Sequence, residues 1–440
     1  MGSVSAPISL SRALVTAVRA LPVTDRDLRG AERFVRDWLG CTVAGRSGRP
    51  GIALVRYGKG QADLESRVFL AAALAHVTET DDLHRASITH PGTVVVPTAV
   101  LLGRQLGVGG KAVLTAILAG YEVMLRVGEA LGPRHYKIFH NTATAGVFGS
   151  AAAAASLLEL SDEQWTWALG NAGTQAAGLW QFNEDATMSK PLHTGHAASA
   201  GLRAARLARE GFTGPARILE GNRGFFRGLC PDPNPDAVLR PASGWKLHET
   251  SLKPYASCRH THPVVDAALE LRDQLAGTSF PGNDTRVAIE SYAVAVGLND
   301  DPDPGSPYAA QFSLQFCAAT ALLHGAPGLA AFEPAALQDA DLRALLLRTS
   351  VAEDRALSAV YPASWGGTVE VTHGGRAYRA TRSAALGDPE LPLSDAALDV
   401  KVRGLLEFGG LSAEAADRLL AACRALPENG PIEGLSAALL

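Results

Sequence analysis

The chain has 440 residues, of which 47% are hydrophobic and only 6% aromatic, and its formal net charge is −4. This length allows two or three domains of average size. A core built mainly from Ala, Leu and Val favours helices that pack closely. The Lys and Arg residues are dispersed and form no basic stripe, which argues against nucleic acid or an anionic membrane surface as a partner.

The cysteines give no framework for disulfides or metals. There are five of them, far apart in the sequence and without a C-x-x-C pair: Cys41, Cys230, Cys258, Cys317 and Cys423. This spacing is unlike that of disulfide scaffolds, structural zinc sites and iron–sulfur sites. The N-terminal residues lack a basic segment followed by an apolar one, and no uncharged apolar run is long enough to span a membrane. We therefore expect a cytoplasmic protein without a membrane segment.

The first half of the chain has a helical pattern. Apolar residues recur at steps of three and four from about residue 10 to residue 230, and glycines close several of these runs. Ser161 and Gln164 form the pattern of a capping box before the helical segment that follows them. Several of these helices are apolar on more than one face, which is typical of a buried helical layer.

The pattern changes near residue 230. A loop rich in Pro and Asp is followed by a helix at 263–275, a strand-like alternation at 285–296 and two strand-like runs around a Gly-Gly turn at 368–382. Helical patterns return after residue 393. We predict a mainly α fold with an inserted α+β domain. Residues 1–254 and 393–440 would form one large all-helical domain, and residues 255–392 a smaller lid domain.

The segment 79–92 (ETDDLHRASITHPG) is the most polar part of the helical half. It contains three carboxylates and two histidines: Glu79, Asp81, Asp82, His84 and His90. The adjacent aspartates resemble part of the D-D-x-x-D magnesium motif, but Arg85 occupies the third acidic position. A metal site is not predicted, because His84 and His90 lack the spacing of ligands on one helix face. An acid–base site is the alternative, since clustered carboxylates shift one another's pKa and stabilise a nearby imidazolium.

Two further segments contain clusters of polar residues, and a single histidine, His140, stands apart from them. Lys190, His193 and His196 lie among small residues at 185–201, and His140 precedes another Ala-rich helix. Four cationic or titratable residues stand before a helix start at 251–269: Lys253, Arg259, His260 and His262. Helix starts and basic side chains together bind carboxylates or phosphates. We expect these clusters and the segment 79–92 to form one shared polyanion-binding cleft.

The chain resembles the MmgE/PrpD family almost from end to end. The family includes 2-methylcitrate dehydratase, cis-aconitate decarboxylase and iminodisuccinate epimerase. The segments that carry the resemblance are FVRDWLGCTVAG (34–45), HVTETDDLHRASITHPG (76–92), FHNTATAGVFGSAAAAA (139–155), SKPLHTGHAASAGL (189–202), GFTGPARILEG (211–221), SLKPYASCRHTHP (251–263) and GDPELPLS (387–394). The resemblance implies a helical domain made from both chain ends, an inserted lid domain and a homodimer.

The resemblance also implies site residues. The positions that match the family's active-site motifs are Glu79, His90, His140, Lys190 and His262. Leu83 stands in the place of an active-site threonine and Phe316 in that of a tyrosine. These two differences separate the chain from cis-aconitate decarboxylase and weaken a strict assignment to 2-methylcitrate.

The chemistry implied by the family passes through a carbanion or enolate next to a carboxylate. Such chemistry needs cations that bind carboxylates and one acid–base group, and it needs no cofactor. We assign acid–base work to His90 or His140, with Glu79, Asp81 and His84 setting protonation and orientation. We assign substrate binding to the remaining candidates, which are Lys190, His193, Lys253, Arg259 and His262.

We therefore predict a cofactor-independent lyase, most simply a dehydratase, that acts on a small di- or tricarboxylate. The alternatives are an epimerase of an α-substituted dicarboxylate, a decarboxylase of a cis-aconitate-like acid, and a binding or scaffold protein without catalysis.

Overall fold

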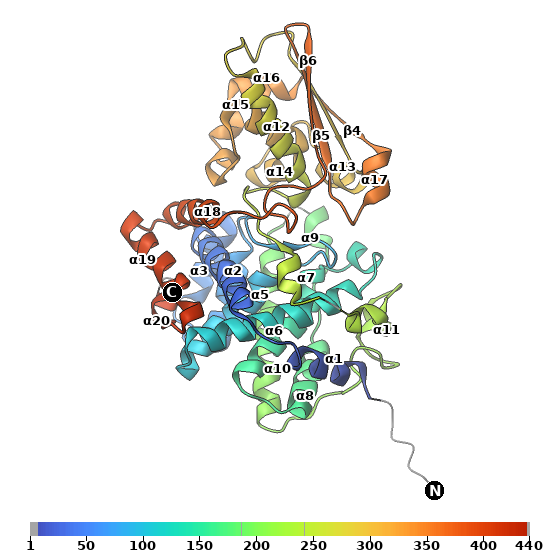
Figure 1. Cartoon of the computed structure of the whole chain (residues 1–440), viewed down its shortest axis with the longest axis vertical. Coiled ribbons are helices and arrows are strands. Elements are labelled where there is room, and N and C mark those ends of the chain that lie inside the picture. Colours follow the sequence, from blue (N-terminus) through green and yellow to red (C-terminus); the bar gives the residue numbers. More distant parts are fainter. Residues whose placement is uncertain (1–7, 186, 242, 438–440) are drawn as a thin grey trace. The chain divides into compact units, whose positions relative to one another are not determined.

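The computed structural model describes residues 8–185, 187–241 and 243–437. The chain divides into two compact units (Figure 1): residues 1–250 together with 396–440, and residues 251–395. The first unit is almost entirely helical and the second combines helices with a sheet. This confirms the predicted fold class, a mainly α protein with an inserted α+β part. The limits proposed from the sequence were residues 254 and 392, and the units divide after residues 250 and 395.

The first unit is built from helices contributed by both ends of the chain. Its main elements are α1 (Leu10–Arg19), α2 (Asp25–Ala44), α3 (Arg49–Gly58), α4 (Leu64–Ala75), β1 (Leu83–His84), α5 (Pro91–Leu106), α6 (Gly110–Glu129), α7 (Asn141–Leu157), α8 (Asp162–Gly173), α9 (Gln181–Glu184), α10 (Lys190–Arg209), α11 (Phe225–Leu229), α18 (Asp395–Phe408), α19 (Ala413–Arg424) and α20 (Glu433–Ala437). The two-residue strand β2 (Thr250–Ser251) lies where the units divide.

Helix α7 is the centre of this unit. It packs against α5, α6, α8 and α10, and nearly all of its residues are buried. Its small residues make this possible. A Cβ added to Gly149 would lie 3.1 Å from the carbonyl oxygen of Gly120 on α6. The composition rich in Ala and Gly therefore sets the close spacing of the helices whose first residues carry the candidate site.

Local signals place several helix ends. Ser161 and Gln164 form the predicted capping box at the start of α8, and Thr24 with Asp27 forms a second one at α2.

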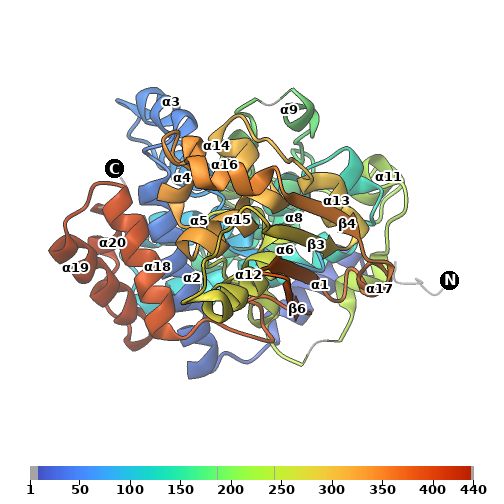
Figure 2. The same ribbon diagram turned by 90° about the horizontal axis from the view of Figure 1, so that it is seen from above.

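The helices of the last segment, α18, α19 and α20, lie side by side in both ribbon views (Figures 1 and 2). Helix α19 contacts α2 and α20 contacts α5, so the C-terminal segment completes the first unit.

The second unit is a four-stranded mixed sheet with helices on one face. Its elements are α12 (His262–Leu275), β3 (Arg286–Ser291), α13 (Ala293–Asn299), α14 (Pro307–Gln311), α15 (Leu314–His324), α16 (Ala340–Leu346), β4 (Thr349–Glu353), α17 (Arg355–Val360), β5 (Gly367–His373) and β6 (Arg376–Arg382). The strand order is β4-β3-β5-β6, with β3 and β4 parallel and the other pairs antiparallel. Helix α12 packs on β5 and β6 and also against α15.

The strand predictions hold in part. The hairpin at 368–382 is confirmed, and Gly374 and Gly375 make its turn with φ of +58° and +73°, which glycine adopts without strain. The strand predicted over 285–296 is wrong beyond residue 291, because residues 293–299 form the short helix α13. Alternating Ala and Val fit either period in so short a run.

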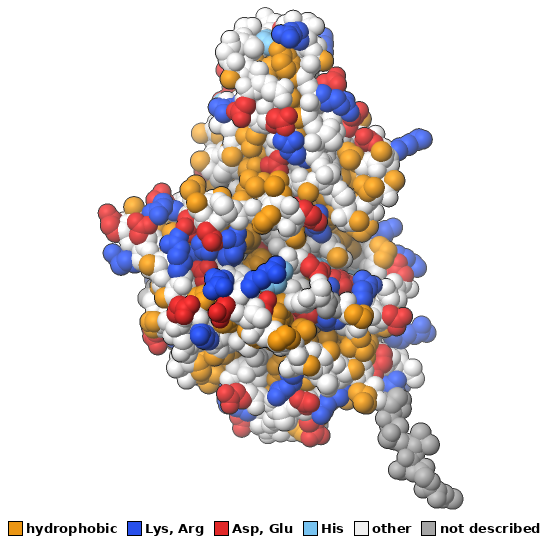
Figure 3. Space-filling view, viewed as in Figure 1, with side chains coloured by type: hydrophobic (Ala, Val, Ile, Leu, Met, Phe, Trp, Pro, Cys, Tyr) orange, Lys and Arg blue, Asp and Glu red, His pale blue; other side chains and the backbone are white. Residues whose placement is uncertain are grey.

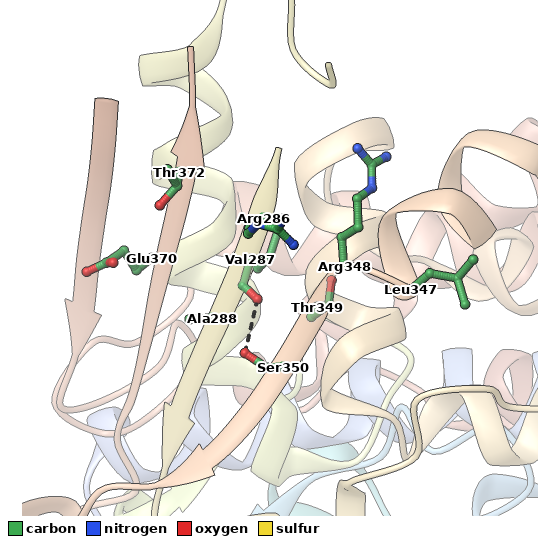
Figure 4. Close-up of a pocket in the computed structure, with 9 residues that line it drawn as sticks. All are labelled: Arg286, Val287, Ala288, Leu347, Arg348, Thr349, Ser350, Glu370 and Thr372. Carbon is green, nitrogen blue, oxygen red and sulfur yellow. Dashed lines mark hydrogen bonds between the residues drawn. The ribbon is translucent and has the colours of Figure 1, made fainter. Parts of the chain in front are cut away.

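One pocket of about 400 Å³ lies in the second unit, where β3 and β5 meet the start of β4 (Figure 4). The charged side chains in its lining are Arg286, Arg348 and Glu370. None of the candidate site residues lines it, so it does not coincide with the chemistry expected from the sequence.

Acidic and basic side chains are interspersed over the face shown in Figure 3. Among the helices of the described residues, none combines the length and the apolar character that crossing a membrane requires.

Candidate active site

The loop between α4 and α5 carries the candidate acid–base residues. Helix α4 ends at Ala75 with His76 as its C-cap, and α5 begins at Pro91 with His90 as its N-cap. Proline is favoured at the first position of a helix, where no N–H is needed. The residues from His76 to His90 therefore lie between two fixed helix ends.

Asp81 contacts two histidines through a single oxygen. Its Oδ2 lies 2.7 Å from Nδ1 of His76 and 2.9 Å from Nδ1 of His90. The contact with His76 has the geometry of a hydrogen bond, and that with His90 is less well aligned. Burial on its own would raise the pKa of Asp81, but the two imidazoles outweigh it and hold that pKa well below its usual value. Asp81 is therefore a buried, ionised carboxylate.

Two further histidines extend this group. His140 is the N-cap of α7, and His193 lies in the first turn of α10. The ring of His76 is stacked on that of His140 at 5.5 Å, and the rings of His140 and His193 are 5.6 Å apart. The ring of His90 lies 4.8 Å from that of His76. We call His76, His90, His140 and His193 the histidine cluster.

Most of the cluster is neutral at physiological pH. Burial lowers the pKa of His76 to about 4, and burial together with nearby cationic groups lowers the pKa of His193 to about 4. The pKa of His140 is also well below its usual value, for the same reasons. The cluster therefore offers neutral imidazole nitrogens for hydrogen bonding.

Lys190 and Glu79 form a buried ion pair beside the cluster. Lys190 is the first residue of α10, and its Nζ contacts Oε1 of Glu79. Glu79 adopts a left-handed backbone conformation with φ of +56°, which is unfavourable for a residue with a Cβ. Strain of this kind is found at functional sites, where the surrounding structure imposes it. The carboxylate-binding role expected for Lys190 must accommodate this existing partner.

Asp82 has a different part from its neighbour. It accepts hydrogen bonds from the backbone N–H of Gly92 and, at 2.8 Å, from the hydroxyl of Tyr121. Burial, together with Asp37 and Asp81, raises its pKa well above the usual value. A Cβ on Gly92 would lie 2.8 Å from Oδ1 of Asp82. Asp82 thus ties the loop to the first turn of α5.

His84 contacts a separate set of residues. Its Nδ1 lies 2.8 Å from Oγ of Ser87, and its Nε2 is 3.8 Å from Glu129 and 3.6 Å from Glu249. Lys246 pairs with both of these glutamates. The hydrogen bond from His84 and the charge of Lys246 lower the pKa of Glu249 to about 2. The contacts of His84 thus do not join it to the histidine cluster.

Two features of this region were not predicted from the sequence: the histidine His76, and the aromatic pair Trp180 and Phe182. His76 ends an apolar helical run and was not singled out, although it lies only three residues before Glu79. The rings of Trp180 and Phe182 border the cluster, at 5.1 Å from His140 and 5.4 Å from His193 respectively. A histidine at the C-cap of a helix, beside an acidic loop, is a local signal that could have indicated His76. No comparable signal marked the aromatic pair.

The donor atoms of His76, Asp81 and His90 lie within 4.8 Å of one another. Two imidazoles and a carboxylate are a donor set that suits Zn²⁺. However, tetrahedral ligands bonded at about 2.0–2.1 Å lie about 3.3 Å apart. The separations of 2.7 and 2.9 Å from the shared oxygen are instead those of direct contacts. We describe the group as two imidazoles in direct contact with one carboxylate.

In the second unit, Arg259 and Asp388 form a buried ion pair. Asp388 also accepts hydrogen bonds from Oγ of Ser251 at 2.7 Å and from the backbone of Ala385. Although burial by itself raises the pKa of Asp388, Arg259 lowers it below its usual value. The guanidinium expected to bind substrate therefore already has a carboxylate partner.

The other candidates of this unit surround the start of α12. His262 is the first residue of that helix, and its Nε2 lies 3.2 Å from the carbonyl oxygen of Ser257. Lys253 is 1% exposed. His260 is stacked on Trp365 at 4.3 Å, and burial, followed by the charges of Arg259 and Lys253, lowers its pKa to about 3. The assignment of Lys253, Arg259 and His262 to substrate binding stays a prediction.

The two positions that depart from the family pattern are both buried. Leu83 is 3% exposed in β1, and Phe316 is fully buried in α15 with its ring 5.8 Å from that of Phe332. Each therefore contributes an apolar surface where the resemblance implies a hydroxyl group.

Comparison with known proteins defines the class. Residues 13–237 match the MmgE/PrpD N-terminal domain, and residues 255–426 match the MmgE/PrpD C-terminal domain. The chain belongs to the MmgE/PrpD family.

Its similar proteins include several decarboxylases. The chain is 28% identical to cis-aconitate decarboxylase of Homo sapiens over 373 residues, which cover 78% of this chain and 76% of that protein. It is 26% identical to cis-aconitate decarboxylase of Mus musculus over 375 residues, covering 77% and 74%. A third, cis-aconitate decarboxylase of Aspergillus terreus, is 29% identical over 216 residues, covering 46% and 44%. These relatives are lyases.

Proposed function

We propose that the protein is a cofactor-independent lyase that acts on a small di- or tricarboxylate by proton transfer at the carbon next to a carboxylate. The observation that carries this proposal is the ionised Asp81 facing Nδ1 of His90. A carboxylate in this position favours the imidazole tautomer with its proton on Nδ1 and leaves Nε2 as a base. After Nε2 takes a proton, the same carboxylate stabilises the imidazolium.

The surroundings of His90 suit a substrate with several carboxylates. Lys190 supplies a buried ammonium group, and the neutral imidazoles of His140 and His193 supply hydrogen bonds without adding a competing base of ordinary pKa. Nδ1 of each of these two histidines is buried without a hydrogen-bond partner among the described residues. Buried polar atoms of this kind are generally satisfied by a ligand or water.

Dehydration of a 2-methylcitrate-like hydroxy acid is the first candidate reaction. The base removes the proton next to the carboxylate, and the electrons of that C–H bond form the alkene. The C–O bond at the neighbouring carbon then breaks, and the departing hydroxide takes a proton and leaves as water. The buried apolar side chain of Leu83 separates this site from that of the decarboxylases, because the resemblance implies an active-site hydroxyl there.

Decarboxylation of a cis-aconitate-like acid is the second candidate, and the relatives favour it. Here the C–C bond to one carboxylate breaks and releases CO₂. Its electron pair shifts onto the carbon skeleton, which then takes a proton from an imidazolium. The same acid–base group serves both reactions, and only the leaving group differs.

The test is a panel of acids given to purified protein: 2-methylcitrate, citrate, cis-aconitate and an α-substituted dicarboxylate. Release of water with formation of an alkene supports the first candidate, and release of CO₂ supports the second. Solvent deuterium that enters the α-carbon without loss of water or CO₂ would instead indicate epimerisation. If no acid is converted in any of these ways, the lyase proposal is wrong.

Variants test the site independently of the substrate's identity. His90→Gln removes the base, and we expect kcat to fall by about 10²–10⁴-fold, the usual contribution of a general base. Lys190→Met removes the ammonium group, and we expect mainly a rise in KM. His324→Gln is the matched control, because His324 is half exposed and pairs with Asp339 in the second unit. Turnover that survives His90→Gln unchanged contradicts the assignment of the base.

The family resemblance also supports a homodimer. Light scattering after size-exclusion chromatography measures the mass directly, and a monomeric mass for active protein contradicts this proposal.

A further inference from the structure

We propose that His76 is a positioning residue: its Nδ1–H holds Asp81 in place and in its ionised form, and Asp81 in turn orients the imidazole of His90. This inference rests on the proposed function, because it assigns the base to His90. His76 is the first residue of the segment 76–92 that carries the family resemblance, but the sequence analysis gave it no role.

The two donors that face Asp81 stand at the two ends of its loop, His76 at the start and His90 at the end. Its Oδ2 receives both histidine contacts, and its Oδ1 is buried without a hydrogen-bond partner among the described residues. Asp81 itself is 1% exposed. A buried carboxylate without sufficient donors takes up a proton, because burial disfavours its charged form. The better aligned of its two contacts is the one to His76.

His76 is held in a fixed orientation. It caps the C-terminus of α4, its ring is stacked on that of His140 with an angle of 13° between the planes, and the ring of His90 meets its edge. The low pKa of His76 keeps it neutral. A neutral imidazole that faces a carboxylate through Nδ1 carries its proton on that nitrogen. His76 is therefore a hydrogen-bond donor to Asp81 with a defined direction.

Exposure distinguishes the two histidines. Both face Asp81 through Nδ1 and have Nε2 as the opposite ring nitrogen, so their chemistry alone does not separate them. The side chain of His90 is 11% exposed, whereas that of His76 is 0% exposed. Only His90 presents a surface to a ligand. The arrangement gives one reactive imidazole and one that holds the shared carboxylate.

Other charged or titratable groups also act on Asp81 and His76. They come from the helices packed around the loop and are Cys41, Tyr121, His140, Lys190, His193 and Lys401, together with Asp82 of the same loop. All of them remain in place when His76 alone is replaced. A change in pH dependence caused by that replacement therefore reports the lost donor.

Two substitutions separate the donor from the packing. His76→Asn keeps a side-chain N–H near the position of Nδ1, and His76→Leu fills similar space without a donor. In the leucine variant Asp81 loses a hydrogen bond that favours its ionised form, so the pKa of the Asp81–His90 pair rises. We expect the acidic limb of the kcat/KM profile to move to higher pH by about one unit, because one lost partner changes a pKa by about that much. In the asparagine variant we expect the limb to stay near that of the wild type.

The result that overturns the proposal is a leucine variant, folded by circular dichroism, whose acidic limb matches that of the wild type. Equal shifts in the asparagine and leucine variants also overturn it, because they would mean that ring packing and not the donor matters. His324→Leu controls for the loss of an unrelated histidine.

A second readout does not need turnover. In protein labelled with ¹⁵N-histidine, ring-nitrogen shifts report the tautomer of each imidazole, and the His90 signals are identified by their loss in His90→Gln. We expect His90 to keep its proton on Nδ1 in the wild type and in His76→Asn, and to populate both tautomers in His76→Leu. An unchanged His90 tautomer in the leucine variant contradicts the inference. If no acid is converted but this change is seen, the proposed function fails and the positioning role stands.

Discussion

Replacing Lys401 tests how the first unit stabilises the loop between α4 and α5, which carries the candidate acid–base residues. It lies on α18, in the C-terminal segment, and its Nζ donates a hydrogen bond of 2.7 Å to the carbonyl oxygen of Thr80. The same ammonium pairs with the carboxylate of Asp37 on α2. Although burial alone would lower it, the neighbouring Asp37 raises the pKa of Lys401 above its usual value. We therefore consider the substitution Lys401→Met, which keeps the length of the side chain and removes its charge.

The expected loss of stability follows from burial. The side chains of Lys401 and Asp37 are 7% and 2% exposed, so this is a buried pair. Removing one partner of such a pair costs about 3–5 kcal/mol, because the other charge is left without compensation. Part of that cost is the carbonyl of Thr80, which loses its donor. We expect Lys401→Met to lower the free energy of unfolding of the first unit by about 3–4 kcal/mol.

A double variant tests the cause. Lys401→Met combined with Asp37→Asn also removes the carboxylate charge that stays buried after the loss of Lys401, so it should be more stable than Lys401→Met alone. Lys111→Met is the matched control, since Lys111 is exposed on α6. Exposed positions of this kind change stability by less than about 0.5 kcal/mol.

Hydrogen exchange followed by mass spectrometry suits a chain with two compact units, because it reports each segment separately. We expect faster exchange in α2, α18 and the loop 76–82 of Lys401→Met. If Lys401→Met lowers the free energy of unfolding by less than about 1 kcal/mol, the reasoning from burial is refuted. A double variant that is less stable than Lys401→Met alone would refute it as well.

Two further predictions concern stability. Gly201→Ala should destabilise the protein by about 1–3 kcal/mol in calorimetry, because the added Cβ would lie 2.5 Å from the carbonyl oxygen of Val147; an unchanged melting temperature would show that α7 and α10 can separate freely. Stability should also fall as the pH is lowered from 6.5 to about 4. The folded state holds His76 and His193 with a pKa of about 4 against the ordinary 6.5, so the unfolded state binds more protons in that window. His193→Asn should make the fall less steep, and an equal slope in urea titrations at several pH values would exclude this cause.

The helical starts explain why part of the site was predictable. His90, His140 and Lys190 each stand at or next to the first residue of a helix. In each case Pro or small residues follow, a pattern that can be read locally. We expected these residues to lie close together, because a polar side chain at the start of a buried helix has few other polar side chains to contact. The structure brings them together with Glu79, Asp81 and His193.

His84 and His76 show the limit of that reading. His84 lies within the polar segment, yet a short pairing of its backbone with Thr89 fixes its direction, and its ring contacts Ser87 and Glu129 instead of the cluster. His76 lies at the end of an apolar helix, and among the described residues only Asp81 accepts a hydrogen bond from its ring. Proximity in sequence does not determine which way a side chain points.

Arg259 shows a second limit. Its residue type and its place before a helix suggested a free carboxylate-binding group, but Asp388 pairs with it from a loop far along the chain. Long-range ion pairs of this kind leave no periodic or local pattern. Their existence is decided only when the chain is packed.

The sequence by itself determined the class of fold, the two-part organisation and the family. These properties follow from the period of apolar residues, from helix caps and turns, and from motifs spread over the whole chain. Tertiary structure decided which histidine is exposed, which carboxylate is ionised and which cations already have partners. Burial and the distance between charges set these properties, and both arise only when segments that are separate in sequence are packed against one another.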